Sequence, residues 1–103
     1  MVKIIQNNDM SEALTKKYAV IDFSAVWCGP CKMTAPILEK LSNEMSEVAF
    51  YNLDVDVNDE LAMQFGIQSI PTMVVLKEGK PVAQTVGFRP EPALRSWIEQ
   101  AVA

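Results

Sequence analysis

The chain has 103 residues, half of them hydrophobic, which suits one compact domain with one core over residues 1–103 and leaves no room for a second. Its formal net charge of -4 at pH 7 argues against nucleic acid as a partner, because a phosphate-binding surface needs clustered Lys and Arg. No stretch approaches the roughly 20 apolar residues that span a bilayer, and no apolar secretory segment precedes residue 10, so we expect a cytoplasmic protein without membrane contact.

The first half of the chain alternates between predicted strands and helices. Residues 2–6 alternate like a short edge strand, and residues 7–9 offer capping groups for a helix that reaches about residue 17. Residues 19–26 form an apolar run typical of a strand buried on both faces. Apolar residues then recur with helical spacing over residues 31–44. We expect the first helix to turn three apolar side chains inward, namely Met10, Ala13 and Leu14.

The second half continues the alternation and then changes. Residues 48–55 are β-rich, and a short helix is predicted over residues 58–65. The three strand–helix units favour parallel strands joined by right-handed crossovers. Residues 72–77 and 82–86 are separated by only four residues and therefore predict a hairpin. Pro81 cannot donate to a strand ladder, so the second hairpin strand should lie at a sheet edge.

A helix is predicted to end the chain, after Pro90 and Pro92. Its apolar residues lie on one stripe, where a core role is expected for Trp97. The element order is then βαβαβαββα.

In the earlier helix over residues 31–44, Pro36 removes one backbone hydrogen bond and should produce a kink.

The two cysteines of the chain, Cys28 and Cys31, lie where the buried strand gives way to a helix. At such a turn the first N–H groups of the helix lack partners and the macrodipole is positive, so a thiolate on Cys28 is favoured over a thiol. Pro30 fits the first helical turn, where its missing N–H costs nothing. Cys31 lies one turn further in, should be more shielded, and is placed to close a ring with Cys28. The pattern indicates redox chemistry.

Two other interpretations of the cysteine pair are less favoured. A structural disulfide across a four-residue loop gives only about 2 kcal/mol, against nearly 5 for a loop of about 100 residues, and is a poor staple. A zinc site needs two further nitrogen or sulfur ligands, and the chain has no His and no third Cys. We therefore expect no metal.

Residues 25–32, Ala-Val-Trp-Cys-Gly-Pro-Cys-Lys, resemble the active-site signature of the thioredoxin family. The Gly-Pro pair between the cysteines separates this signature from the glutaredoxins, which usually carry Pro-Tyr, and from disulfide isomerases and bacterial oxidases, which carry a His. The similarity runs nearly from end to end. Further matching stretches are residues 20–23, 35–38, 52–56, 65–67, 69–72 and 86–87.

This resemblance implies an α/β structure of the thioredoxin fold, with a five-stranded mixed sheet and two helices on each face. It also implies a thiol–disulfide oxidoreductase, in which Cys28 attacks a target disulfide and Cys31 resolves the mixed disulfide, leaving a Cys28–Cys31 disulfide. The partners implied are disulfide-containing target proteins and a thioredoxin reductase, most often a flavoenzyme that uses NADPH. We expect a monomeric carrier with protein-disulfide reductase activity and no tightly bound cofactor.

Asp22 interrupts the apolar run of a predicted central strand, where a carboxylate is costly to bury without a partner. From the sequence alone, a strand-end residue that reaches solvent stays open. The resemblance implies a buried Asp behind the second cysteine that exchanges its proton. Bacterial family members often carry a Lys nearby, but the aligned residue here is Phe50, so desolvation should dominate and raise the pKa of Asp22.

The Ile70-Pro71 bond precedes the hairpin, and sequence alone favours trans. The resemblance implies a cis proline beside the disulfide, with the preceding backbone free to pair with an extended substrate segment. Leu53 and Phe88 would also rim this groove, but a core position suits Leu53 at least as well, and packing beneath the last helix is the alternative for Phe88. The substrate-binding residues implied are Trp27, Gly29, Pro30, Ile70, Pro71 and Gly87.

Ser24 and Val26 depart from the family pattern, which often has an aromatic and an acidic residue at these positions. These changes would alter the surface beside Cys28.

Two other functional classes stay open. One is a binding module in which the cysteines matter little. The other is an oxidase or isomerase of more oxidising potential, against which the Gly-Pro pair argues.

Overall fold

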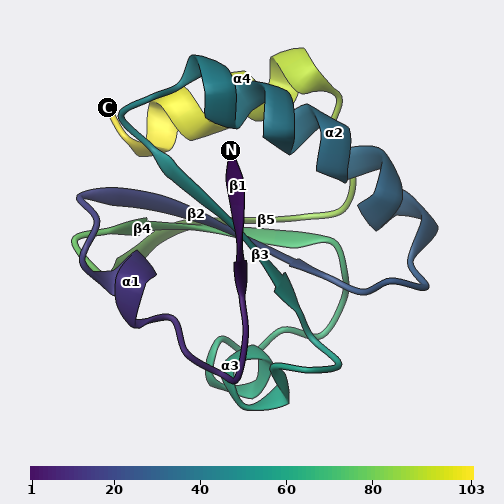
Figure 1. Ribbon diagram of the computed structural model, residues 1–103. Helices are drawn as coiled ribbons and strands as arrows, with labels where there is room; N and C mark the ends of the chain where they lie inside the picture. Colours follow the sequence, from purple (N-terminus) through teal and green to yellow (C-terminus); the bar gives the residue numbers. More distant parts are fainter.

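The computed structural model describes residues 1–103 and arranges them as one mixed sheet with a pair of helices on each side (Figure 1). The element order is the predicted βαβαβαββα. The strands are β1 (Val2–Ile5), β2 (Tyr18–Ser24), β3 (Ala49–Asp54), β4 (Thr72–Lys77) and β5 (Lys80–Val86). The helices are α1 (Ser11–Leu14), α2 (Gly29–Glu44), α3 (Asp59–Gln64) and α4 (Glu91–Ala101).

The five strands follow the order β1-β3-β2-β4-β5, with β1, β3 and β2 parallel and with β4 and β5 antiparallel to their neighbours. The sheet is therefore mixed, as predicted. The hairpin of β4 and β5 is also confirmed. Pro81 lies in the edge strand β5, opposite Leu76, where the register of the hairpin shifts. At this position the missing N–H of Pro81 is tolerated.

Strand β2 lies at the centre of the sheet, and all its residues from Ala19 to Ser24 are buried. Because successive side chains of a strand point to opposite faces, β2 supplies two cores. Ile21 and Phe23 pack with residues of α1 and α3 in one cluster. Val20 belongs to the other cluster, formed with α2 and α4, and the same alternation places Asp22 on this second face.

The first helix is shorter than predicted. It spans Ser11–Leu14 and does not reach residue 17, because the chain turns after Thr15 to begin β2 at Tyr18. Met10 and Ala13 are buried as expected, but the inward placement of Leu14 is wrong, since its side chain is 46% exposed. A helix of one turn offers only a narrow inward stripe.

The boundary between β2 and α2 also differs by two residues from the prediction. The strand ends at Ser24, and the helix begins at Gly29. Between them the chain makes a turn in which the N–H of Cys28 donates to the carbonyl of Ala25 at 3.2 Å. Pro36 lies inside α2, which runs as one helix to Glu44.

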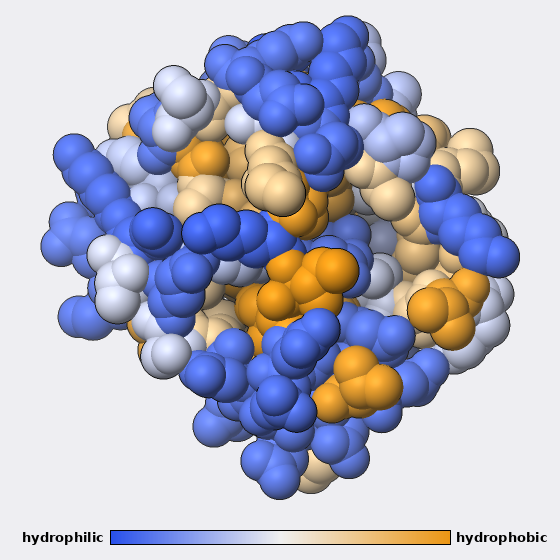
Figure 2. Space-filling model, in the orientation of Figure 1, coloured by the Kyte–Doolittle hydropathy of each residue, from blue (hydrophilic) through white to orange (hydrophobic).

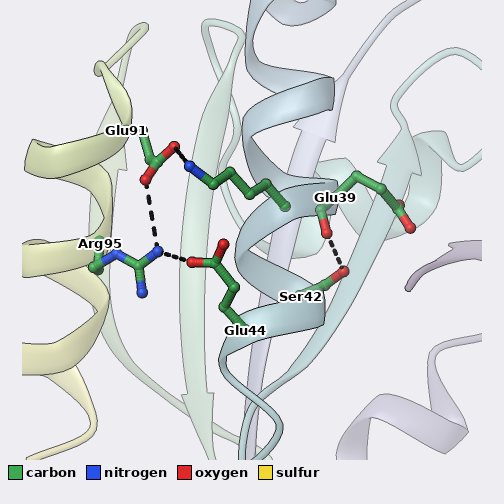
Figure 3. Close-up of polar contacts among 6 residues, drawn as sticks. Glu39, Ser42, Glu44, Glu91 and Arg95 are labelled. Carbon is green, nitrogen blue, oxygen red and sulfur yellow. Dashed lines mark hydrogen bonds and ion pairs between the residues drawn. The ribbon is translucent and has the colours of Figure 1, made fainter.

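An ionic network joins α4 to α2 (Figure 3). The guanidinium of Arg95 contacts the carboxylates of Glu44 and Glu91, and Lys40 donates to Glu91 at 2.8 Å. The network lies over the apolar contacts of Leu94 and Ile98, so it fixes the orientation of the last helix while burial supplies most of the attraction.

Hydrophilic side chains cover most of the face shown in Figure 2, and a small apolar patch lies near its centre, where Figure 1 places β1. The edge strand β1 contributes the exposed side chain of Ile4. None of the four helices combines the length and the apolar character that a membrane crossing requires.

A buried amide holds the loops at one end of the sheet together. Asn58, which is fully buried, donates to the carbonyls of Ile5 and Asp54 at 3.1 Å each and accepts from the N–H of Asn8 at 2.9 Å. The side chain of Asn8 in turn accepts from the N–H of Leu61 at 3.1 Å. The two asparagines therefore tie β1 and β3 to α3.

We expect Asn58→Ala to destabilise the protein by about 3 kcal/mol, because it leaves buried backbone groups without partners. Urea unfolding at pH 7 measures the change. Asn43→Ala is the matched control, since Asn43 contacts only the exposed N-terminal ammonium, and it should cost less than about 0.5 kcal/mol. Equal stability of the two variants would show that Asn58 does not hold the loops.

Candidate redox site

Cys28 and Cys31 form a disulfide at the start of α2, with their Cα atoms 5.3 Å apart. Cys28 is the N-cap residue of the helix, with extended backbone angles, and its sulfur accepts from the N–H of Cys31 at 3.2 Å. Pro30 lies in the first turn of the helix, as its missing N–H allows. A sulfur at this position faces the unpaired N–H groups of the helix, which stabilise negative charge.

The two cysteines are equally shielded in the disulfide form, with 5% and 4% exposure for Cys28 and Cys31. The expected contrast in shielding is therefore absent from this structure. Position relative to the helix still distinguishes them, because Cys28 precedes the first turn and Cys31 lies inside it.

An exposed apolar rim surrounds the disulfide. Ala25, Val55 and Ile70 pack against the two cysteines, and Trp27 stands outside them with 68% of its side chain exposed. The indole N–H of Trp27 donates to a carboxylate oxygen of Asp56 at 2.8 Å, which fixes the ring on the surface. No local sequence pattern predicts this contact, which joins residues 29 positions apart.

The Ile70-Pro71 bond is cis, and Pro71 is buried at the start of β4. The carbonyl of Pro71 accepts from the N–H of Gly87 at 2.8 Å, and the positive φ of 94° at Gly87 suits glycine. Neither the N–H nor the carbonyl of Ile70 takes part in a hydrogen bond of the chain. Its backbone is therefore available to an extended partner.

A hollow of about 180 Å³ opens beside this backbone. Most of its lining is apolar, and it connects the indole of Trp27 to the side chain of Ile70. Five further residues complete the lining of the hollow. They come from the chain just after β3, from α3 and from the loop after α3, namely Val55, Ala62, Ile67, Gln68 and Ser69.

Asp22 is 1% exposed, and one of its oxygens, Oδ1, has no hydrogen-bond partner. Its other oxygen accepts from the side-chain nitrogen of Asn52 at 3.2 Å. Burial raises the pKa of Asp22 to about 6, and the hydrogen bond from Asn52 opposes the rise. The expectation that Phe50 takes the place beside Asp22 is wrong, because Phe50 lies opposite Val20 in the strand register and Asn52 lies opposite Asp22. No cation forms an ion pair with Asp22. Desolvation is thus the main cause, as the sequence predicts.

Asn52 also donates from the same nitrogen to the hydroxyl of Ser24 at 2.7 Å. Asp22 and Asn52 lie directly opposite each other in the register of β2 and β3, on the face that α2 covers. Asn52 is a site residue that was not predicted from the sequence. The available signal was a polar residue at an inward position of a β-rich run, opposite a second polar residue in the next strand.

The other residues that the sequence analysis singled out differ in how far they are exposed to solvent. Gly29 and Pro30 are exposed beside Cys28, and a Cβ added at Gly29 would meet no atom within 4 Å. Leu53 is fully buried in the core, whereas Phe88 is 38% exposed. Trp97 packs against the core beneath α4, as expected. No cluster of three or more His, Cys, Asp or Glu residues is arranged to hold a metal ion.

Comparisons with known proteins agree with this geometry. The family profile described as Thioredoxin matches residues 1–100. The chain is 43% identical over 100 residues to a thioredoxin of Bacillus subtilis, covering 94% of this chain and 96% of that one. It is 39% identical over 100 residues to a thioredoxin of Chlamydia muridarum, covering 97% and 98% of the two chains.

Solved structures give the same result. The thioredoxin of Fasciola hepatica superposes with a TM-score of 0.89 at 36% identity, covering 97% of this chain and 99% of that chain. A mutant thioredoxin of Halobacterium salinarum gives 0.89 at 33% identity, covering 98% and 90%. The fold, the cysteine pair and the full-length similarity agree, and the chain belongs to the thioredoxin family.

Proposed function

We propose that this protein reduces disulfides of other proteins through a dithiol–disulfide cycle at Cys28 and Cys31. The family and the fold make it a thiol–disulfide oxidoreductase. The observation that carries the proposal is the cysteine pair itself, with one sulfur at the N-cap of α2 and the other one turn inside the helix. Residues 1–103 act as one domain in this proposal.

In the reduced protein, the Cys28 thiolate attacks one sulfur of a target disulfide and forms a mixed disulfide with it. The other target sulfur leaves as a thiolate and takes up a proton. Cys31 then loses its proton and attacks the sulfur of Cys28, which forms the Cys28–Cys31 disulfide and releases the second target thiolate. Two electrons and two protons reach the target in each cycle.

The buried carboxylate of Asp22 is the proposed acceptor for the proton of Cys31. With a pKa of about 6, it is mostly ionised at neutral pH and can both take up and release a proton. Two hollows support a path between the groups. Asp22 and Asn52 line one, and Cys31 and Asn52 line the other, each large enough to admit water.

Targets would bind over the apolar rim and pair with the free backbone of Ile70. An extended segment that lies along this backbone adds a short strand and places its disulfide against Cys28. The hollow beside Trp27 would take a side chain of the same segment. In this arrangement Gly29, Pro30, Pro71 and Gly87 contribute shape and close backbone approach.

A thioredoxin reductase would return the Cys28–Cys31 disulfide to the dithiol, since the family implies such a partner. The flavin and NADPH chemistry belongs to that reductase. A monomeric state and a cytoplasmic location stay predictions of the sequence.

The first prediction separates the roles of the two cysteines. Cys28→Ser should be inactive, because the attacking sulfur is gone. Cys31→Ser should still attack targets but accumulate a covalent complex, since no sulfur remains to resolve it. Mass spectrometry of the reaction with a disulfide-bonded protein detects this complex. Turnover by Cys31→Ser, or faster alkylation of Cys31 than of Cys28 at pH 6, would reverse the assignment.

A double variant, with both Cys28→Ser and Cys31→Ser, tests the binding-module alternative. If the protein served only as a scaffold, a partner enzyme would keep its activity when both cysteines are changed to Ser. Loss of that activity supports the redox role.

The second prediction concerns the docking surface. Ile70→Lys should raise the KM for a protein disulfide about tenfold with little change in kcat, because a charge replaces an apolar contact beside the disulfide. Assays with dithiothreitol as the electron donor avoid any effect on the reductase. Met63→Lys is the control, because Met63 is exposed on α3 outside the hollow. Equal KM values for the two variants would contradict docking at Ile70.

The third prediction concerns the cost of burying Asp22. Its folded-state pKa is raised from 3.8 to about 6, which corresponds to about 3 kcal/mol. The folded state binds more protons, so stability should fall as pH rises from about 4 through 6, with the full penalty above pH 6. Asp22→Ala should therefore be more stable than the parent at pH 8, by about 1 kcal/mol after its small cavity is subtracted. At pH 4 the order should reverse.

Urea unfolding across this pH range, alongside exchange rates, checks the third prediction. Asp22→Ala should also be slower than the parent in resolving mixed disulfides at neutral pH. Glu47→Ala serves as the control, since it removes a carboxylate that is exposed. A variant that is less stable at pH 8 and equally fast would remove Asp22 from the mechanism.

A further inference from the structure

Asn52 links two other polar side chains, Asp22 and Ser24, beneath α2. Its side-chain nitrogen donates to Asp22 at 3.2 Å and to Ser24 at 2.7 Å. Asp22 and Ser24 are buried, and both lie on the face of β2 that Asn52 faces from β3. Asp22 has no other hydrogen-bond partner. Within the chain, one amide therefore supplies the only hydrogen bond to this carboxyl group, against the effect of burial on its pKa.

We propose that Asn52 is a positioning residue that serves Asp22 in both protonation states, by donating to the ionised carboxylate and, after its amide rotates, accepting from the carboxylic acid. This inference rests on the proposed role of Asp22 as the proton acceptor of Cys31. A primary amide carries two N–H donors at one end and an acceptor oxygen at the other. Rotation by about 180° exchanges the two ends without moving the backbone.

Ser24 makes the rotation compatible with full hydrogen bonding. Its hydroxyl accepts from Asn52 when the amide nitrogen faces it, and the same hydroxyl can donate when the amide oxygen takes that place. The amide oxygen of Asn52 is not among the buried atoms that lack a hydrogen-bond partner. The position that it occupies can therefore hold either the oxygen or the nitrogen of the amide. The contacts of Asn52 with Asp22 and Ser24 can therefore form in either protonation state of Asp22, although the second oxygen of Asp22, Oδ1, has no partner.

A fixed cation in place of Asn52 would behave differently. It would stabilise only the ionised carboxylate and would hold it against protonation. An apolar residue would leave the carboxylate with no donor at all, which favours the acid. Asn52 lies between these limits and suits a group that must gain and lose a proton in each cycle.

Asn52 also lies between the two hollows that separate Asp22 from Cys31. One hollow is lined by Asp22 and the other by Cys31, and both are lined by Asn52 and Ala35. A proton that moves through these hollows from Cys31 towards Asp22 would travel alongside this amide. The Asn52 amide thus contacts the proton acceptor, Asp22, and also borders the hollows through which the proton would move.

Other ionisable groups face the same region. Glu39 of α2 lines the hollow of Asp22 and lies 4.0 Å from the N-terminal ammonium, at the end of β1. Lys32 of α2 and Asp54 of β3 line the hollow of Cys31. The neighbour of Asp22 on β4 is the apolar Met73. Glu39→Gln is therefore the control for a general electrostatic effect.

The test compares Asn52→Leu with the parent by NMR titration of the Asp22 carboxyl carbon in the full-length protein. We expect the titration midpoint to rise by about one pH unit, because the hydrogen bond lost from the ionised carboxylate is stronger than the one lost from the neutral acid. Resolution of mixed disulfides by Cys31 should then be about fivefold slower at pH 6 and about twofold slower at pH 7, with no difference at pH 9. Glu39→Gln should shift the midpoint far less.

Rotation of the amide has its own readout in the parent protein. The side-chain NH₂ resonances of Asn52 should titrate with the midpoint of Asp22, and this titration should vanish in Asp22→Asn. In the Asp22→Asn background, Asn52→Leu should leave the pH profile unchanged. If Asn52→Leu fails to fold, Ser24→Ala replaces it, with a smaller upward shift expected because one N–H of the amide loses its acceptor.

An unchanged Asp22 midpoint in Asn52→Leu, or Asn52 resonances that do not titrate, would overturn the proposal. A failure of the underlying function gives a different result. In that case the midpoint shifts as expected while the rate of resolution by Cys31 stays constant at every pH. That outcome would retain the hydrogen-bond arrangement and reject Asp22 as the proton acceptor.

Discussion

The burial of β2 on both faces is the constraint on which the rest of the structure depends. A strand with apolar side chains on each side is stable only when two layers cover it, so the chain must place helices above and below the sheet. Helices α1 and α3 cover Ile21 and Phe23, and α2 and α4 cover Val20. The ionic contacts of Arg95 orient α4 within this arrangement, but the apolar contacts beneath it require the helix to be there.

The site follows from the same constraint. Because β2 is central and leads directly into α2, the turn between them brings a helix N-terminus to the end of the sheet, and Cys28 occupies it. Burial of the same strand makes Asp22 a carboxylate without solvent. One strand therefore supplies the position of the attacking sulfur and the low polarity that perturbs the proton acceptor.

The sequence predicted what depends on local pattern. Alternation of strands and helices, the hairpin at Pro81 and the strand–helix turn at Cys28 are written in neighbouring residues, and all three were correct in type. The cis bond before Pro71 agrees with the family resemblance, whereas local preference favours trans. Element ends were less accurate, since the length of α1 is decided by where β2 must begin.

Contacts between distant segments could not be predicted in the same way. Asn52 meets Asp22 across 30 residues of sequence, and Asn8 meets Asn58 across 50. Each depends on the exact pairing of strands or loops, which no local period determines. The hydrogen bond that holds Trp27 to Asp56 is a further contact of this kind.

The pairing of Asp22 with Asn52 has a consequence for how this chain can change length. Side chains alternate along β3, so a single residue inserted or deleted before Asn52 within the strand would turn Leu53 or Tyr51 towards the carboxylate. A two-residue change would restore the face but bring Phe50 or Asp54 opposite Asp22. Insertions in the turn after Asp54 leave the pairing intact. Homologues that keep this chemistry should therefore vary in the lengths of their loops and hold the length of β3 constant.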